Sequence, residues 1–108
     1  MKGVVILSTA ASKEEAERLA EALVRQKLAA CVNLVPGVTS FFHWDGKLNR
    51  EEEIFLIIKT TDEKSRRVGE VIRELHSYEV PEMIYWRLDG GSADYLKWLE
   101  EATREEGA

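Results

Sequence analysis

The chain has 108 residues, of which 44% are hydrophobic and 32% are charged, and its formal net charge is −5. This apolar share excludes an intrinsically disordered chain, and the acidic balance argues against a nucleic-acid partner, which normally requires a basic patch or stripe. The single cysteine, Cys31, excludes an intrachain disulfide and favours a reducing compartment. No apolar run approaches the roughly 18 residues of a membrane span, so we expect one cytoplasmic domain over residues 1–108, with no membrane partner.

The chain begins with a predicted strand and helix. Residues 4–7 are continuously apolar and mostly β-branched, which is typical of a strand buried on both faces. Ser12 and Glu15 form a capping-box pattern, in which each side chain is expected to bond the backbone amide of the other residue. Apolar residues at helical spacing follow and predict a helix over residues 12–28.

A long hairpin is predicted next. Residues 31–44 form an extended stretch interrupted by Pro36-Gly37, and proline belongs at a sheet edge or a bulge because it cannot donate to a ladder. Asp45-Gly46 suits a two-residue type I′ turn. The return strand runs from residue 48 to residue 61, and its second half, residues 54–58, is again continuously apolar.

The remaining segments complete an α+β pattern. A helix is expected from Asp62, a strand over residues 83–88 after Pro81, and a last helix marked by apolar residues from Tyr95 to Ala102. The order is therefore β-α-β-β-α-β-α. The first and third strands are apolar on both faces, which suits the centre of a sheet, and the two strands that carry or follow a proline suit its edges. An antiparallel sheet of order 4-1-3-2 meets both requirements, so we predict a ferredoxin-like βαββαβ sandwich with an extra C-terminal helix.

Two observations predict self-association. The helices of this fold cover one face of the sheet, yet the central strands are apolar on both faces. In addition, the 14 residues from 31 to 44 would reach about 46 Å, whereas a domain of this size is about 33 Å across. The hairpin tip, which carries Phe42 and Trp44, must then project towards another chain. The alternative is a strong bulge at Pro36-Gly37 that folds the strand back.

Several motifs resemble one protein family over nearly the whole chain. They are the segments 28–40, 44–47, 58–60, 75–82 and 95–99. In order and spacing these segments resemble the CutA family of divalent-cation tolerance proteins. The resemblance implies a tight homotrimer, akin in architecture to the PII signalling proteins, with a role in tolerance to divalent metals, notably copper. Phe42, Trp44 and Trp86 are then expected in the trimer interface.

The resemblance also directs attention to possible metal ligands. His76 at the end of the second helix, with Glu79 and Glu82, could form a mixed nitrogen and oxygen site for Cu²⁺ or, as a second choice, Zn²⁺. The alternative role of His76 is a C-terminal helix cap, where the helix dipole favours a protonated imidazole. Some copper-binding members carry cysteine where this chain has Ser8 and a second histidine where it has Leu75.

Lys59 and Tyr78 are the other candidate site residues. We expect them in a ligand cleft between subunits, with Lys59 facing the loop of Tyr78 and Glu79; the alternative for Lys59 is a salt bridge to Glu79. Phosphate-binding and nucleophile motifs are absent, and the segment after the first strand lacks the arginine of acylphosphatases, so we expect no enzyme and no organic cofactor. The prediction is a homotrimer that binds metal ions or a small ligand. A trimeric scaffold that docks other proteins is the alternative, and an acylphosphatase-like enzyme is the second alternative.

Overall fold

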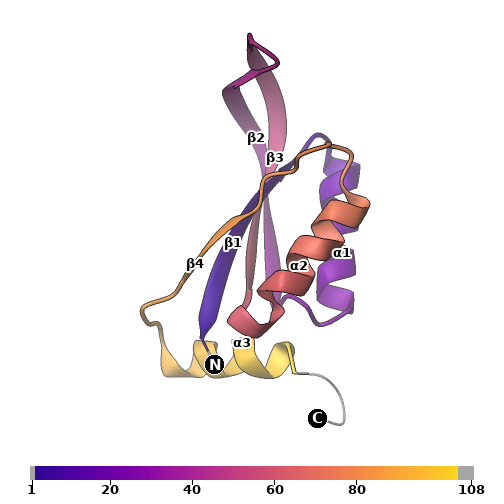
Figure 1. The fold of residues 1–108 in the computed structure, drawn as a ribbon. Coiled ribbons are helices and arrows are strands. Elements are labelled where there is room, and N and C mark those ends of the chain that lie inside the picture. The colour runs from indigo at the N-terminus through magenta and orange to yellow at the C-terminus, as the bar shows by residue number, and fades with distance from the viewer. Residues whose placement is uncertain (1, 105–108) are drawn as a thin grey trace.

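The computed structural model describes residues 2–104, which form a four-stranded antiparallel sheet and three helices (Figure 1). The elements in chain order are β1 (Gly3–Ala10), α1 (Lys13–Arg25), β2 (Cys31–Trp44), β3 (Lys47–Thr61), α2 (Asp62–Leu75), β4 (Ile84–Arg87) and α3 (Ala93–Ala102). The strands are arranged β2-β3-β1-β4, which confirms the predicted ferredoxin-like order. Within the described residues, no helix is both long enough and apolar enough to cross a membrane.

Helix α1 is shorter than the sequence predicted. It ends at Arg25 and not near residue 28, because Lys27 adopts a left-handed conformation with φ of 59°. The backbone N–H of Leu28 then bonds the carbonyl of Leu23 at 2.9 Å, and that of Lys27 bonds the carbonyl of Val24 at 3.0 Å. These two bonds form a Schellman motif, which usually places glycine at the left-handed position. Because this position holds a lysine and not a glycine, the sequence gives no sign that the helix ends here.

The hairpin of β2 and β3 turns as predicted and projects from the rest of the molecule. Asp45 and Gly46 both have positive φ, 55° and 74°, as a type I′ turn requires. Figure 1 shows the tip of the hairpin standing clear of the helices. The molecule is accordingly elongated, with principal extents of 47 × 26 × 21 Å.

The predicted bulge is also present, but it does not fold the strand back. Val35 pairs with Phe55, whereas the next pair joins Val38 to Glu53, so β2 holds one extra residue. Gly37 absorbs the irregularity with φ of 76°, a conformation that costs glycine little. The pairing then continues to the tip. The bulge and the projecting hairpin, which the sequence analysis treated as alternatives, therefore occur together.

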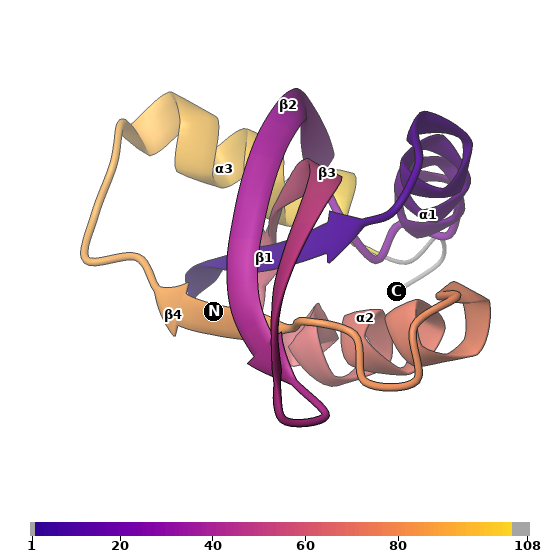
Figure 2. The same cartoon turned by 90° about the horizontal axis from the view of Figure 1, so that it is seen from above.

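The core lies between one face of the sheet and the first two helices. Alternate residues of β1 from Val4 to Ala10, and of the last part of β3 from Leu56 to Thr60, point to this face and are fully buried. Helices α1 and α2 supply their apolar stripes. Figure 2 shows α1 and α2 together on one side of the sheet and α3 apart from them. The largest contributors are Ile6, Leu19, Leu23, Leu56, Ile58 and Ile72.

The opposite face of the sheet is apolar and largely uncovered. Helix α3 packs near Gly3 at one end of it, through Leu96. Over the rest of this open face the strand register aligns residues from four strands, and Trp86 and Ile84 of β4 remain 50% and 56% exposed. The apolar members of the open face are Val5, Leu7, Val35, Phe55, Ile57, Ile84 and Trp86. Contiguous apolar surface of this kind marks an association site.

We therefore expect the chain to self-associate through the open face. In sedimentation at micromolar concentration the wild-type protein should be heavier than 12.3 kDa, the mass of one chain. Trp86→Lys should shift the distribution towards the single chain, because it places a charge on the apolar patch. Val24→Lys is the control, since Val24 is also exposed but lies on α1. A wild-type protein that stays folded as a single chain would contradict the prediction.

Candidate functional site

The segment after α2, residues 76–82, crosses the end of the sheet before the chain enters β4 (Figure 1). We call it the post-helix segment. It meets the end of β1, the start of α1 and the middle of β3, and several polar side chains are buried at this junction. Four of the five site residues predicted for metal or ligand binding lie on this segment: His76, Tyr78, Glu79 and Glu82.

Glu15 anchors the post-helix segment to α1. Ser12 Oγ accepts the backbone N–H of Glu15 at 3.2 Å, as the capping box predicted. The return bond differs from the prediction, because the Glu15 carboxylate accepts the N–H of Ala11 at 3.2 Å and does not reach Ser12. Its other oxygen accepts the backbone N–H of Ser77 at 2.6 Å, and Ser77 Oγ donates to the carboxylate at 3.1 Å. One carboxylate thus joins two segments that are far apart in sequence.

The hydrogen bonds of Glu15 also keep it ionised. Burial by itself would raise the pKa of this carboxyl, but the donors from Ser77 and Ala11 outweigh burial and hold the pKa below its usual value. The residue is 4% exposed, so the charge sits in a nearly dry environment and depends on these donors.

Both ring nitrogens of His76 form hydrogen bonds within the chain. Its Nε2 lies 2.6 Å from the carbonyl oxygen of Thr9 and must donate to it, while its Nδ1 accepts the backbone N–H of Tyr78 at 3.0 Å. These partners select the neutral imidazole, so the 3.7 Å contact between Nδ1 and Glu15 is not an ion pair in this arrangement. His76 is the C-cap residue of α2, as the alternative role proposed, but the protonated ring expected there is not what the geometry supports.

Tyr78 is held at both ends. Its hydroxyl donates to Glu53 at 2.8 Å, and its ring packs on the His76 ring with centroids 4.7 Å apart. Burial, reinforced by the bond to Glu53 and by the negative charges of Glu53 and Glu51, raises the pKa of Tyr78. Burial and Glu53 likewise raise the pKa of Glu82. Glu53 thus acts on both groups, and the junction gathers several carboxylates.

The predicted metal ligands do not converge within one chain. Among residues 2–104 no group of three or more His, Cys, Asp or Glu side chains is placed to hold a metal ion. Glu79 and Glu82 are exposed, whereas His76 is buried with both ring nitrogens occupied. Ser8, the position at which the resemblance implies a cysteine in some copper-binding members, is fully buried and donates to the backbone carbonyl of Glu82 at 2.7 Å.

Lys59 lies away from this junction. It pairs with Val5 and Cys31 near the end of β3, six positions beyond Glu53, which corresponds to about 20 Å along a strand. Within a single chain, Lys59 therefore does not face the loop of Tyr78, and the expected cleft between subunits stays a prediction. Lys59 belongs instead to the open face, because its register partners lie there.

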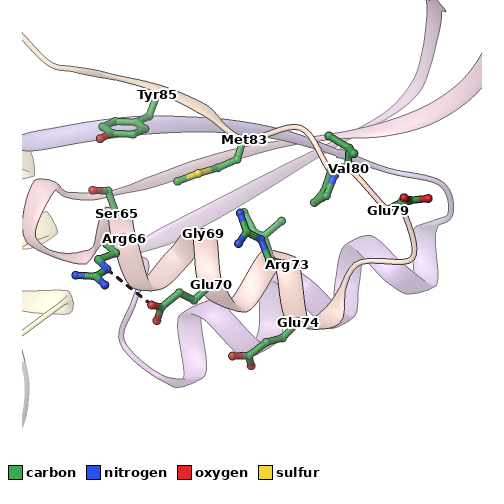
Figure 3. A pocket seen from close by; sticks show the side chains of 12 residues that line it. Ser65, Arg66, Gly69, Glu70, Arg73, Glu74, Glu79, Val80, Met83 and Tyr85 are labelled. Atoms are coloured by element: carbon green, nitrogen blue, oxygen red, sulfur yellow. Dashed lines mark ion pairs between the residues drawn. The ribbon is translucent and has the colours of Figure 1, made fainter. Parts of the chain in front are cut away.

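Two cavities border the post-helix segment. The larger, about 1040 Å³, runs along α2 beside Met83 and Tyr85 and is lined by residues of both charges (Figure 3). An ion pair of Arg66 and Glu70 at 3.8 Å lies on its wall. The smaller, about 370 Å³, lies between this segment and the β2–β3 hairpin. Sequence reasoning missed both, since a cavity depends on how distant segments pack.

The Glu15 anchor predicts a pH-dependent contribution to stability. Glu15→Gln should lower the free energy of unfolding at neutral pH by about 1–3 kcal/mol, because buried donors lose a charged acceptor. The wild-type carboxyl has a lowered pKa when folded. Its contribution is therefore present above the unfolded pKa of about 4.3 and is lost as pH falls through the lower folded pKa.

Urea unfolding of both proteins between pH 7 and pH 2 measures this difference, which should shrink in acid. Glu14→Gln, an exposed neighbour in the same helical turn, is the control for the effect of helix-terminal charge. A constant difference across the pH range would contradict the assigned role of the Glu15 charge.

Known proteins resemble the chain in sequence over most of its length. The family model described as CutA1 divalent ion tolerance protein matches residues 4–102. The chloroplastic protein CutA 1 of Oryza sativa is 42% identical over 94% of this chain and 58% of its own length. The divalent-cation tolerance protein CutA of Thermus thermophilus is 42% identical over 92% of this chain and 96% of its own length. The family description and the name of the Thermus protein refer to cation tolerance and not to an enzymatic reaction.

Solved structures share the fold as well. The rice CutA1 crystal structure superposes with a TM-score of 0.94 at 40% identity, covering 98% of this chain and 97% of the other. A CutA from Archaeoglobus fulgidus, described as periplasmic, gives 0.92 at 39% identity, covering 94% and 99%. Relatives from a chloroplast and a periplasm leave the cytoplasmic location of this chain a prediction. On both sequence and structure, the chain belongs to the CutA1 family of divalent ion tolerance proteins.

Proposed function

We propose that the chain forms a homotrimer that binds divalent metal ions, Cu²⁺ before Zn²⁺, in clefts between its subunits as part of the response to those ions. The observation that carries the proposal is the group of carboxylates, Glu53, Glu79 and Glu82, at the junction of the post-helix segment. Burial and Glu53 together raise the pKa values of Tyr78 and Glu82, and Glu79 is exposed beside them. Bound cations relieve such a concentration of negative charge.

The assembly supplies what one chain lacks. Metal ions need several converging donors, and the described part of one chain offers no such group. A neighbouring subunit packed on the open face and the hairpin could bring further donors to Glu79 and Glu82. Phe42, Trp44 and Trp86 are 39%, 53% and 50% exposed in the single chain, which suits the interface role proposed for them. Lys59 on the open face would then approach another subunit.

One observation favours a second candidate function. The imidazole of His76, the nitrogen ligand of the proposed site, is committed to Thr9 and Tyr78. A chain whose histidine serves only the fold could act as a trimeric scaffold that docks other proteins and binds metal incidentally. In that case the carboxylates of the post-helix segment would contribute little to metal affinity.

Calorimetric titration with Cu²⁺ and Zn²⁺ separates the two candidates. We expect the double variant Glu79→Gln/Glu82→Gln to weaken Cu²⁺ binding about tenfold or more, because it removes two oxygen ligands. His76→Ala is the second variant, and its folded state should first be checked by circular dichroism since it leaves two buried partners unsatisfied. Glu17→Gln, an exposed carboxylate on α1, is the control.

Unchanged Cu²⁺ affinity in the carboxylate variant would remove Glu79 and Glu82 from the site and favour the scaffold. A folded His76→Ala protein that binds as tightly as the wild type would remove His76 as a ligand. Absence of binding in the wild type would end the metal proposal altogether.

A further inference from the structure

The smaller cavity lies where the hairpin leaves the body of the molecule. Its volume is about 370 Å³, within the lower range of small-molecule sites. The hairpin provides one wall and the post-helix segment the other. The lining residues are Ala11, Phe42, Trp44, Asn49, Glu51, Tyr78, Glu79 and Val80.

Three of these residues are aromatic, and all three line the same cavity. Phe42 and Trp44 are two positions apart on β2, so they point to the same face of the hairpin. Tyr78 lines the cavity from the other side and is fixed by its bond to Glu53. An aromatic side chain locked in this way presents its ring at little conformational cost to a ligand.

The charges of the cavity are of one sign. Glu51 and Glu79 are both exposed and both contribute to the lining, and among the described lining residues there is no lysine or arginine. The buried Glu53 lies behind the Tyr78 hydroxyl and adds to the potential. The amide nitrogen of Asn49 donates to the backbone carbonyls of Trp44 and Lys47 at 3.4 and 3.0 Å.

We propose that this cavity is a binding site for a small organic cation, a methylated or primary ammonium group seated against Phe42, Trp44 and Tyr78 and neutralised by Glu51 and Glu79. Aromatic rings attract a cation through the negative electrostatic potential of their faces, and a large, weakly hydrated ammonium gains more from them than a metal ion does. A divalent metal instead requires converging oxygen, nitrogen or sulfur ligands, which the described residues of this chain do not assemble.

This site shares Glu79 with the proposed metal site, but it rests on different observations. All eight lining residues come from a single chain, so the site does not require donors from a neighbour. It uses Glu51 of the hairpin, which has no part in the proposed metal set of His76, Glu79 and Glu82. A neighbouring subunit packed against the hairpin would close the cavity further and strengthen the interaction by excluding water.

Titration of the intact protein with tetramethylammonium chloride tests the inference, with sodium chloride holding the ionic strength constant. We expect saturable shifts of the Trp44 indole N–H resonance, and an affinity about three- to tenfold weaker in Glu51→Gln. Glu52→Gln is a matched control. It changes the same charge one position along, but Glu52 accepts from Thr39 and pairs with Arg50 on the opposite face of the hairpin.

Two further measurements keep the inference falsifiable. Trp44→Leu should weaken binding as well, and Trp98→Leu, which removes an exposed tryptophan on α3, should not. The neutral molecule tert-butanol, similar in size to the cation, should bind much more weakly. Equal binding of both molecules, equal effects of Glu51→Gln and Glu52→Gln, or no saturable shift in the wild type would each overturn the organic-cation site, whatever the outcome with Cu²⁺.

Discussion

Strands β1 and β3 are apolar on both faces, and this constraint determines how the other elements are used. Two helices cover one face and bury Ile6, Leu56 and Ile58 completely. The second face keeps Leu7 and Ile57 beside the half-exposed Trp86, with α3 covering only one end. A single copy of the fold cannot bury that surface, since its remaining segment, the hairpin, extends away from it (Figure 1). Self-association is therefore a consequence of strand composition.

The polar junction at the other end of the sheet contains a buried histidine and a buried carboxylate, a pair that can either stabilise a fold or take part in chemistry. A buried histidine beside a carboxylate is a common signature of a functional site. Here the partners of His76 and Glu15 are mainly backbone groups that the fold must satisfy, such as the N–H groups of Ser77 and Tyr78. These bonds position the post-helix segment, and the segment in turn presents Tyr78, Glu79 and Glu82 at the surface. The side chains available to bind a ligand are therefore those at the surface, and not the buried His76 and Glu15, whose polar atoms are already hydrogen-bonded within the chain.

The fold could be predicted from the sequence because local signals agreed with one another. Asp45-Gly46 specified the turn, and strand composition ordered the sheet correctly. The features that the sequence did not reveal depend on the conformation of single residues or on contacts between distant segments. Lys27 takes a left-handed conformation, which is not typical of lysine, and for this reason the end of α1 was not predicted from the sequence. Lys59 lies far from Tyr78 within one chain, so their expected meeting depends on a neighbouring subunit. The reach of Glu15 to Ser77 joins positions 62 apart in sequence.

For the site, residue type indicated the segment where the candidate residues lie, and the ligand itself stays a prediction. The post-helix segment does gather charge, but its histidine faces inward while Glu79 shares a cavity with Trp44 and Phe42. A negative potential attracts any cation, so the arrangement of the groups that line the site must decide which kind of cation binds there. Oxygen atoms that converge favour a small metal ion, whereas aromatic walls favour a larger ammonium group. In a single chain the aromatic walls are already assembled, and the converging oxygens would have to come from a neighbouring subunit. Assembly is then the step that would separate the two cation classes, since metal binding should require it, whereas ammonium binding should only be strengthened by it.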